Sequence, residues 1–269
     1  MITRTPTRFL TVLTFAVAAL AASACHRGLR KDDVRMSNPE VIYERAHHEL
    51  ASSNYEGAIK LYEALEARYP FSDSARQARL DLMYAYYRNH ETESAVDAAE
   101  QFIRENPTHP RGDYAYYIKG LVYFEDTPNF VERIFRVDLN ERPPIDGLKS
   151  FAALQTLIQR YPRSPYAHDA ERRMTYLRNR LATYEMQVAD YYMRRGAYVA
   201  ALNRAQYTVE HYDGAPAVRE ALEVMIHAYR RMELTDLADK TEVVYHDNYP
   251  DRKVPPDRER KKAWWKVFG

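Results

Sequence analysis

The nucleophilic and metal-binding side chains of this chain do not form a recognisable catalytic motif. There is no glycine-rich phosphate loop, no Gly-x-Ser-x-Gly turn and no His-Glu-x-x-His pair. His47 and His48 are adjacent, so they point to different sides of a helix and make a poor pair of metal ligands. We therefore expect no enzymatic activity, no bound metal and no cofactor.

The single cysteine, Cys25, has the sequence context of a modification site. It follows Ala22-Ser23-Ala24 and an apolar run from Phe9 that is preceded by two arginines, as in a signal peptide. This pattern resembles the bacterial lipobox, in which the cysteine becomes the lipidated N-terminus, although Ala22 stands where that motif prefers Leu. The alternative is ordinary secretory cleavage after Ala24, which leaves a free thiol. We favour a lipoprotein signal over residues 1–24 and lipidation at Cys25, because several acyl chains anchor a protein stably.

The residues after Cys25 predict a destination and a linker. His26, rather than Asp, follows the cysteine, and by the sorting rule of the lipoproteins that the motif resembles this points to the outer membrane. Residues 25–38 are polar and patternless, so we expect a flexible tether. Extended at about 3.3 Å per residue, it would reach about 45 Å from the lipid.

The charged residues favour a protein partner over a nucleic acid. Lys and Arg number 39 and Asp and Glu 38, so the net charge is only +1 and no nucleic-acid binding is expected. Arg194, Arg195 and Arg204 cluster in the C-terminal half, where guanidinium groups suit the carboxylates of an acidic partner. The alternative for Arg194 and Arg195 is a solvated helix end, where positive charge favours the helix dipole. Both interpretations stay open for these two residues.

Tyrosine is unusually frequent, with 23 residues against nine Phe. A tyrosine ring has an apolar body and a polar tip, which suits half-buried positions between helices or along a groove. We expect a subset that includes Tyr84 and Tyr116 to line a groove and to stack on an extended client peptide with an aromatic last residue. The alternative is that most of them fill gaps between repeats. The candidates are Tyr84, Tyr86, Tyr87, Tyr114, Tyr116, Tyr117 and Tyr123.

A long helix must position these residues. Neither Pro nor Gly occurs between Pro165 and Gly196, which predicts a helix of roughly 30 residues, or about 45 Å, that opens at Ser164 and closes at Gly196. Pro165 suits the first helical position. An apolar face recurs at three- and four-residue steps, at Ala170, Met174, Leu177, Leu181, Tyr184, Val188 and Tyr191.

The rest of the chain repeats a pattern of small, aromatic and terminal proline residues. This resembles the tetratricopeptide repeat, a pair of antiparallel helices of about 34 residues. We expect an all-α superhelix of five helix pairs with a long central helix, because no single unit can bury its apolar face alone. Repeats 1–3 would form an N-terminal lobe at residues 39–163, with a proline-rich insertion at 125–144. Repeats 4 and 5 and the long helix would form a C-terminal lobe at 164–250.

The C-terminal residues 251–269 form a basic tail that contains Trp264 and Trp265. Pro255-Pro256 breaks the chain before it. We favour a short helix that caps the last repeat. Contact with a membrane interface or a partner is the alternative.

The long-helix stretch also resembles a known family. Its residues are similar to those of the BamD (ComL) lipoproteins of the outer-membrane β-barrel assembly machinery. The similar residues are 161–167, 194–198 and 200–205, with shorter matches at 169–170, 173–174, 181–182, 185, 188–189 and 191–192. The resemblance covers nearly everything from Cys25 to Pro250. The insertion departs from the family's usual charged run at 137–142, so no role is carried over to it.

The resemblance implies a lipid-anchored, non-enzymatic scaffold on the periplasmic face of the outer membrane. In this family the C-terminal repeats dock on the last POTRA domain of the barrel protein BamA, and the N-terminal repeats are proposed to receive C-terminal signals of unfolded outer-membrane proteins. Small lipoproteins such as BamC and BamE also associate. Arg204 matches the family's arginine at the BamA-facing surface by position. The alternative function is a periplasmic repeat lipoprotein that recruits cell-wall enzymes.

Overall fold

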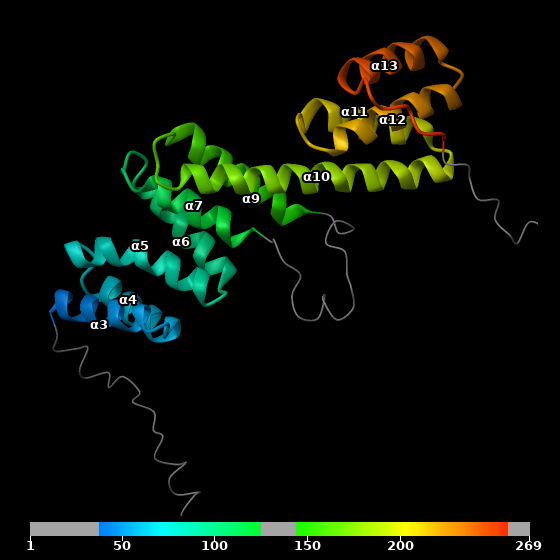
Figure 1. Cartoon of the computed structure of the whole chain (residues 1–269). Helices are drawn as coiled ribbons and strands as arrows, with labels where there is room; N and C mark the ends of the chain where they lie inside the picture. The colour runs from blue at the N-terminus through cyan, green and yellow to red at the C-terminus, as the bar shows by residue number, and fades with distance from the viewer. Residues whose placement is uncertain (1–37, 125–143, 258–269) are drawn as a thin grey trace, which may run out of the picture.

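The computed structural model describes residues 38–124 and 144–257, and these form ten α-helices without a strand (Figure 1). The predicted all-α fold of five helix pairs with one long helix is confirmed. The predicted signal peptide, Cys25, nearly all of the tether and insertion, and the end of the tail lie outside the described residues. The helices are α3 (Pro39–Ala51), α4 (Tyr55–Arg68), α5 (Asp73–Arg88), α6 (Thr92–Glu105), α7 (Gly112–Val122), α9 (Ile145–Arg160), α10 (Ala167–Arg195), α11 (Tyr198–His211), α12 (Ala217–Arg231) and α13 (Thr235–Asn248).

Local sequence determines where these helices begin and end. The side chains of Asn38 and Ser72 accept hydrogen bonds from the amides three residues on, at 2.9 and 3.1 Å, and so cap α3 and α5. Tyr69, Tyr161 and Tyr249 end α4, α9 and α13 with φ near −130°. Each is followed by a proline, which disfavours the helical conformation in the residue before it.

Small residues allow the helices to pack closely in sequence order. Ala46 and Ala58 are fully buried between α3 and α4, and Ala205 and Ala221 between α11 and α12. Each helix contacts the next one along the chain, and α3, α5 and α7 also contact one another in series, as expected for the first helices of stacked repeats. The core is therefore a row of apolar clusters rather than one centre.

The long helix α10 connects two groups of helices (Figure 1). Its first half packs against α9, where Leu177 meets Leu154 and Leu157. Its second half buries Ala182, Met186 and other residues against α11 and α12. The lobe boundaries at residues 163 and 164 stay a prediction.

The end of α10 lies where it was predicted, whereas its start and one residue of its apolar face differ from the prediction. The helix ends at Gly196 as predicted, with φ of 77°, a left-handed conformation that glycine adopts without strain. It begins at Ala167 rather than Ser164. The Ser164 hydroxyl instead donates to Asp113 at 2.7 Å and accepts from the Tyr166 amide at 3.1 Å, which holds residues 164–166 in a turn. Tyr191, expected on the apolar face, is 44% exposed, because the helix turns a second face inward near its end.

Candidate binding surfaces

The structure divides the candidate tyrosines among several surfaces. Tyr116 in the middle of α7 and Tyr123 just after its end line one groove between α6, α7 and α9. Tyr84 and Tyr87 lie on α5 with ring centroids 6.4 Å apart, and the Arg88 guanidinium donates to the Tyr84 hydroxyl at 2.6 Å. Tyr84 and Tyr116, which the sequence suggested as partners in one groove, thus have separate sets of neighbours.

The groove between α6, α7 and α9 comprises two adjoining hollows of about 550 and 360 Å³. Both are lined by Tyr123 and Lys149, and the Lys149 ammonium lies 4.8 Å from the centre of the Tyr123 ring. Lys119 donates to Glu100 at 2.6 Å, and Arg160 donates to the Tyr116 hydroxyl at 3.1 Å. Lys149 in turn donates to Asp146 at 2.9 Å, so each ammonium group of the groove is paired with a carboxylate of its wall. The groove therefore combines aromatic faces with ion pairs, which suits an extended peptide that carries an aromatic side chain.

Two further tyrosines have structural partners. The Tyr86 hydroxyl donates to Glu63 on α4 at 2.7 Å, and burial followed by this hydrogen bond raises the pKa of Tyr86. Tyr114 packs against Tyr166 with a centroid separation of 5.7 Å, and burial raises its pKa as well. The surroundings of these two rings fit the alternative, in which they fill gaps between helices, better than they fit an open groove.

Tyr117 belongs to a polar network that joins α7 to α10. Its hydroxyl donates to Asp169 at 2.7 Å, and its ring stacks on Tyr166 at 4.6 Å. Burial and the bond to Asp169 raise the pKa of Tyr117 to about 12. Burial alone would raise the pKa of Asp169, but hydrogen bonds from Arg173, Tyr117 and Arg172 outweigh it and hold that pKa below its usual value. The network fixes the first turns of α10 to the preceding repeat.

The three candidate arginines differ in how firmly they are held. Arg194 pairs with Asp190 one turn earlier on α10, and Arg195 lies 4.7 Å from the centre of the Tyr191 ring. Arg204 on α11 donates to Glu185 on α10 at 3.1 Å, and this bond raises the pKa of Arg204. The Glu185 side chain is only 11% exposed whereas that of Arg204 is 44% exposed. A mostly buried carboxylate thus orients a guanidinium that still faces solvent.

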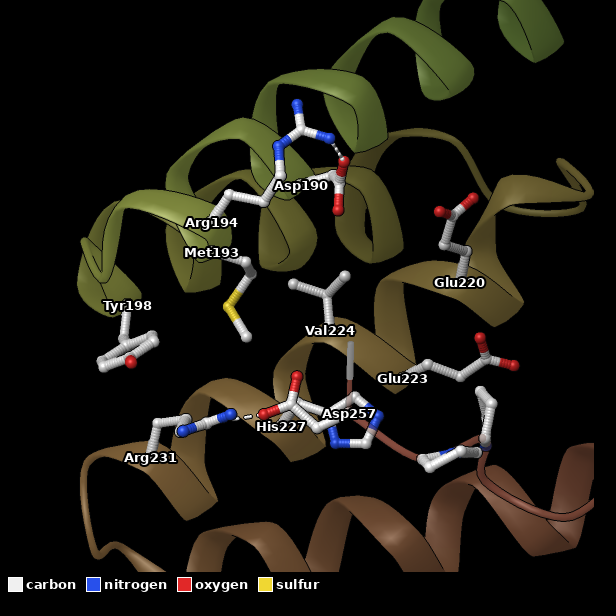
Figure 2. Close-up of a pocket in the computed structure, with 12 residues that line it drawn as sticks. Asp190, Met193, Arg194, Tyr198, Glu220, Glu223, Val224, His227, Arg231 and Asp257 are labelled. Atoms are coloured by element: carbon white, nitrogen blue, oxygen red, sulfur yellow. Dashed lines mark hydrogen bonds and ion pairs between the residues drawn. The ribbon is translucent and has the colours of Figure 1, made fainter. Parts of the chain in front are cut away.

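A cavity of about 240 Å³ lies between the end of α10, α12 and the segment after α13 (Figure 2). Met193 comes down from α10 toward Val224 on α12, and Arg231 bonds Asp257 at 2.6 Å across one wall. Burial lowers the pKa of His227, and its Nε2 is buried with no partner among the described residues. Sequence analysis missed this cavity. The only signal was Pro255-Pro256, which indicates that the chain cannot continue as a helix.

The described ranges 38–124 and 144–257 contain neither a metal-ligand cluster nor a membrane-spanning helix. No cluster of three or more His, Cys, Asp or Glu side chains there could hold a metal ion. No helix in these ranges is both long and apolar enough to cross a membrane.

Comparison with known proteins gives consistent matches over most of the chain. A family model described as outer membrane lipoprotein (YfiO) matches residues 35–244. The outer membrane protein assembly factor BamD of Neisseria meningitidis serogroup B is 40% identical over 257 residues, which cover 93% of this chain and 96% of the relative. BamD of Vibrio cholerae is 41% identical over 203 residues, covering 76% of this chain and 84% of that protein.

The network around Asp169 generates a prediction about stability. We expect Asp169→Asn to lower the free energy of unfolding at pH 7 by about 1–2 kcal/mol, because it removes the negative charge and one of the two acceptor oxygens that receive hydrogen bonds from Arg173 and Arg172. The folded-state pKa is depressed, so this stabilisation is present above the unfolded pKa of about 3.9 and is lost as pH falls through the lower folded value. The difference between wild type and variant should therefore shrink in acid.

Urea unfolding followed by circular dichroism between pH 7 and pH 3.5 measures this difference. Asp97→Asn, at an exposed position on α6, is the control and should unfold like the wild type at each pH. A destabilisation by Asp169→Asn that is absent at pH 7, or that does not change with pH, would contradict the assignment.

Proposed function

The chain belongs to the family of outer membrane lipoproteins that includes the BamD assembly factors, and we propose that it acts in the assembly of outer-membrane proteins as a non-enzymatic binding scaffold. The observation that carries this proposal is the similarity to proteins of that name along nearly the whole of both chains. The fold supports it, because stacked helix pairs present extended surfaces for protein partners. The chain would be anchored through lipid on Cys25 and would face the periplasm.

The partner at the C-terminal helices would be a BamA-type barrel protein, bound through a POTRA domain. Arg204 is suited to this contact because Glu185 engages one of its nitrogens and leaves other N–H groups toward solvent. Tyr207, on the next turn of α11, is 40% exposed and adds an apolar surface beside it. Arginine and tyrosine are enriched among the residues that dominate binding energies. Arg194 and Arg195 would extend the same surface, and other small Bam lipoproteins would join the assembly.

The clients would be unfolded outer-membrane proteins, and the groove between α6, α7 and α9 is the site that we assign to them. Tyr116 and Tyr123 would stack on an aromatic residue of an extended segment. Lys119 and Lys149 would meet a terminal carboxylate only by exchanging their present partners, Glu100 and Asp146, for it.

The partner surface predicts a specific loss of binding. Arg204→Ala should weaken association with the barrel protein at least about tenfold, as loss of a central arginine does at other interfaces. The measurement is affinity capture of the tagged chain from detergent-solubilised envelopes, with the co-purifying barrel protein quantified by mass spectrometry. Glu185→Gln keeps the guanidinium and should retain binding, and so should Arg76→Ala, at an exposed position on α5.

Two results would separate the parts of this proposal. Capture of the barrel protein at wild-type level by Arg204→Ala would reject the assigned surface and leave the function standing. Capture of cell-wall enzymes without any barrel protein by the unaltered chain would reject the function.

The client groove predicts a second loss. The double variant Tyr116→Ala, Tyr123→Ala should weaken binding of a labelled peptide with an aromatic last residue about thirtyfold, because each of the two stacked rings contributes of the order of 1 kcal/mol. Fluorescence anisotropy measures this affinity, and thermal unfolding checks that the variant is folded. Tyr84→Ala is the control and should bind as the wild type does. If Tyr84→Ala weakens binding and the double variant does not, clients bind along α5 instead.

A further inference from the structure

The chain after α13 turns back onto the preceding helices. Tyr249 accepts a hydrogen bond from the Arg252 amide at 3.0 Å, which forms a turn just after the helix. Val254 then packs against Leu222 and Ile226 of α12. The ion pair between Asp257 and Arg231 follows, so the described chain ends in the wall of the cavity (Figure 2).

The cavity has an apolar interior and an acidic rim. Met193, Tyr198 and Val224 line it together with two prolines, and its volume of about 240 Å³ is larger than the cavity of about 150 Å³ that accommodates a benzene ring in another protein. Four carboxylates lie in the wall against two guanidiniums: Asp190, Glu220, Glu223 and Asp257 against Arg194 and Arg231. Asp190 pairs with Arg194, Asp257 with Arg231, and Glu223 with Arg219 from outside the wall, so the rim is acidic by a small excess of charge. An aromatic side chain with basic neighbours would complement this arrangement.

The twelve residues that follow Asp257 have that composition. Residues 258–269 contain five Lys or Arg and one Glu, and they include both tryptophans of the chain, Trp264 and Trp265. Trp264 lies seven positions after Asp257, a stretch that spans at most about 25 Å when extended. A short connection also makes the local concentration of the segment high, and the entropy of closing such a loop is small.

We propose that residues 258–269 dock in this cavity, with one tryptophan ring between Met193, Tyr198 and Val224 and the basic side chains on the rim carboxylates. The tail then acts as an intramolecular ligand of the cavity. This assignment does not depend on the proposed function. It differs from a cap on the outer face of α13, where Leu237 and Val244 are 42% and 48% exposed and offer another apolar surface.

Tryptophan fluorescence tests the proposal directly, because both tryptophans are in the tail. The protein is the full chain with Cys25→Ser, so that no lipid is attached, in buffer without detergent. We expect emission at shorter wavelength than that of the urea-unfolded chain and several-fold weaker quenching by acrylamide. Trp264→Phe and Trp265→Phe identify the ring that is protected.

Cavity variants must then release the ring. Val224→Asn removes the apolar contact and Glu220→Lys reverses one rim charge, and each should move emission to longer wavelength and restore quenching. If circular dichroism shows that Val224→Asn is unfolded, Glu220→Lys decides. Leu237→Asn on α13 is the matched control and should leave the spectrum unchanged.

Five results would overturn the assignment. The emission of the folded chain could equal that of the unfolded chain, or be insensitive to both cavity variants. Sensitivity to Leu237→Asn alone would place the tail on α13. A blue shift that is lost on dilution would indicate docking on a second copy, and one that requires anionic lipid vesicles would indicate a membrane site.

Discussion

The burial of α10 at both of its ends is the constraint on which the rest of the structure depends. Leu177 is fully buried against α9, and Ala189 is fully buried in the C-terminal half of the same helix. Between them Arg180 and Glu185 are also more than nine-tenths buried. Burying a charged group costs free energy unless it is paired, and Glu185 has its partner Arg204 on α11 only while that helix stays in place. A helix of 29 residues is about 43 Å long, and no Gly or Pro interrupts it. The two groups of helices are therefore joined by a regular helix and not by a linker.

This arrangement fixes the position of the two proposed binding surfaces relative to each other. One wall of the groove between α6, α7 and α9 is α9, which packs on the first half of α10, whereas Arg204 belongs to α11, which packs on the second half (Figure 1). Glu185 connects the partner surface directly to α10, just as Asp169 connects α10 to Tyr117 of the earlier repeat. A scaffold built in this way would hold a client and a barrel partner at a fixed separation.

Local sequence predicted the elements well, because helix ends depend on neighbouring residues. Gly196 and the Tyr-Pro junctions could be recognised without knowledge of the fold. The start of α10 could not, since Ser164 is engaged by Asp113, which lies 51 positions earlier in the chain. The second buried face of α10 was hidden because Ala182 and Ala189 alternate with polar residues.

The binding surfaces were harder to predict, because they too depend on contacts between residues far apart in the chain. Helical periodicity places Tyr86 and Tyr116 on helices, but their hydrogen-bond partners come from α4 and α9 and are set by superhelix packing. The cavity is formed only when the segment after α13 returns to α12, a tertiary event without a local signal. Lipidation at Cys25 is predicted from the sequence motif alone. Cys25 lies outside the described residues, so its lipidation stays a prediction.

The most direct test of this account is a distance distribution between the two ends of the molecule, measured by pulsed electron resonance. Spin labels at Lys60→Cys on α4 and Asp239→Cys on α13, both at exposed positions, would be introduced with Cys25→Ser. A pair at Arg172→Cys and Arg194→Cys, about 33 Å apart along α10, gives the width expected for a single helix. The account predicts one narrow distribution for the first pair, comparable with this reference. A broad or two-peaked distribution would contradict it, because the two groups of helices would then move relative to each other, which an uninterrupted α10 does not allow.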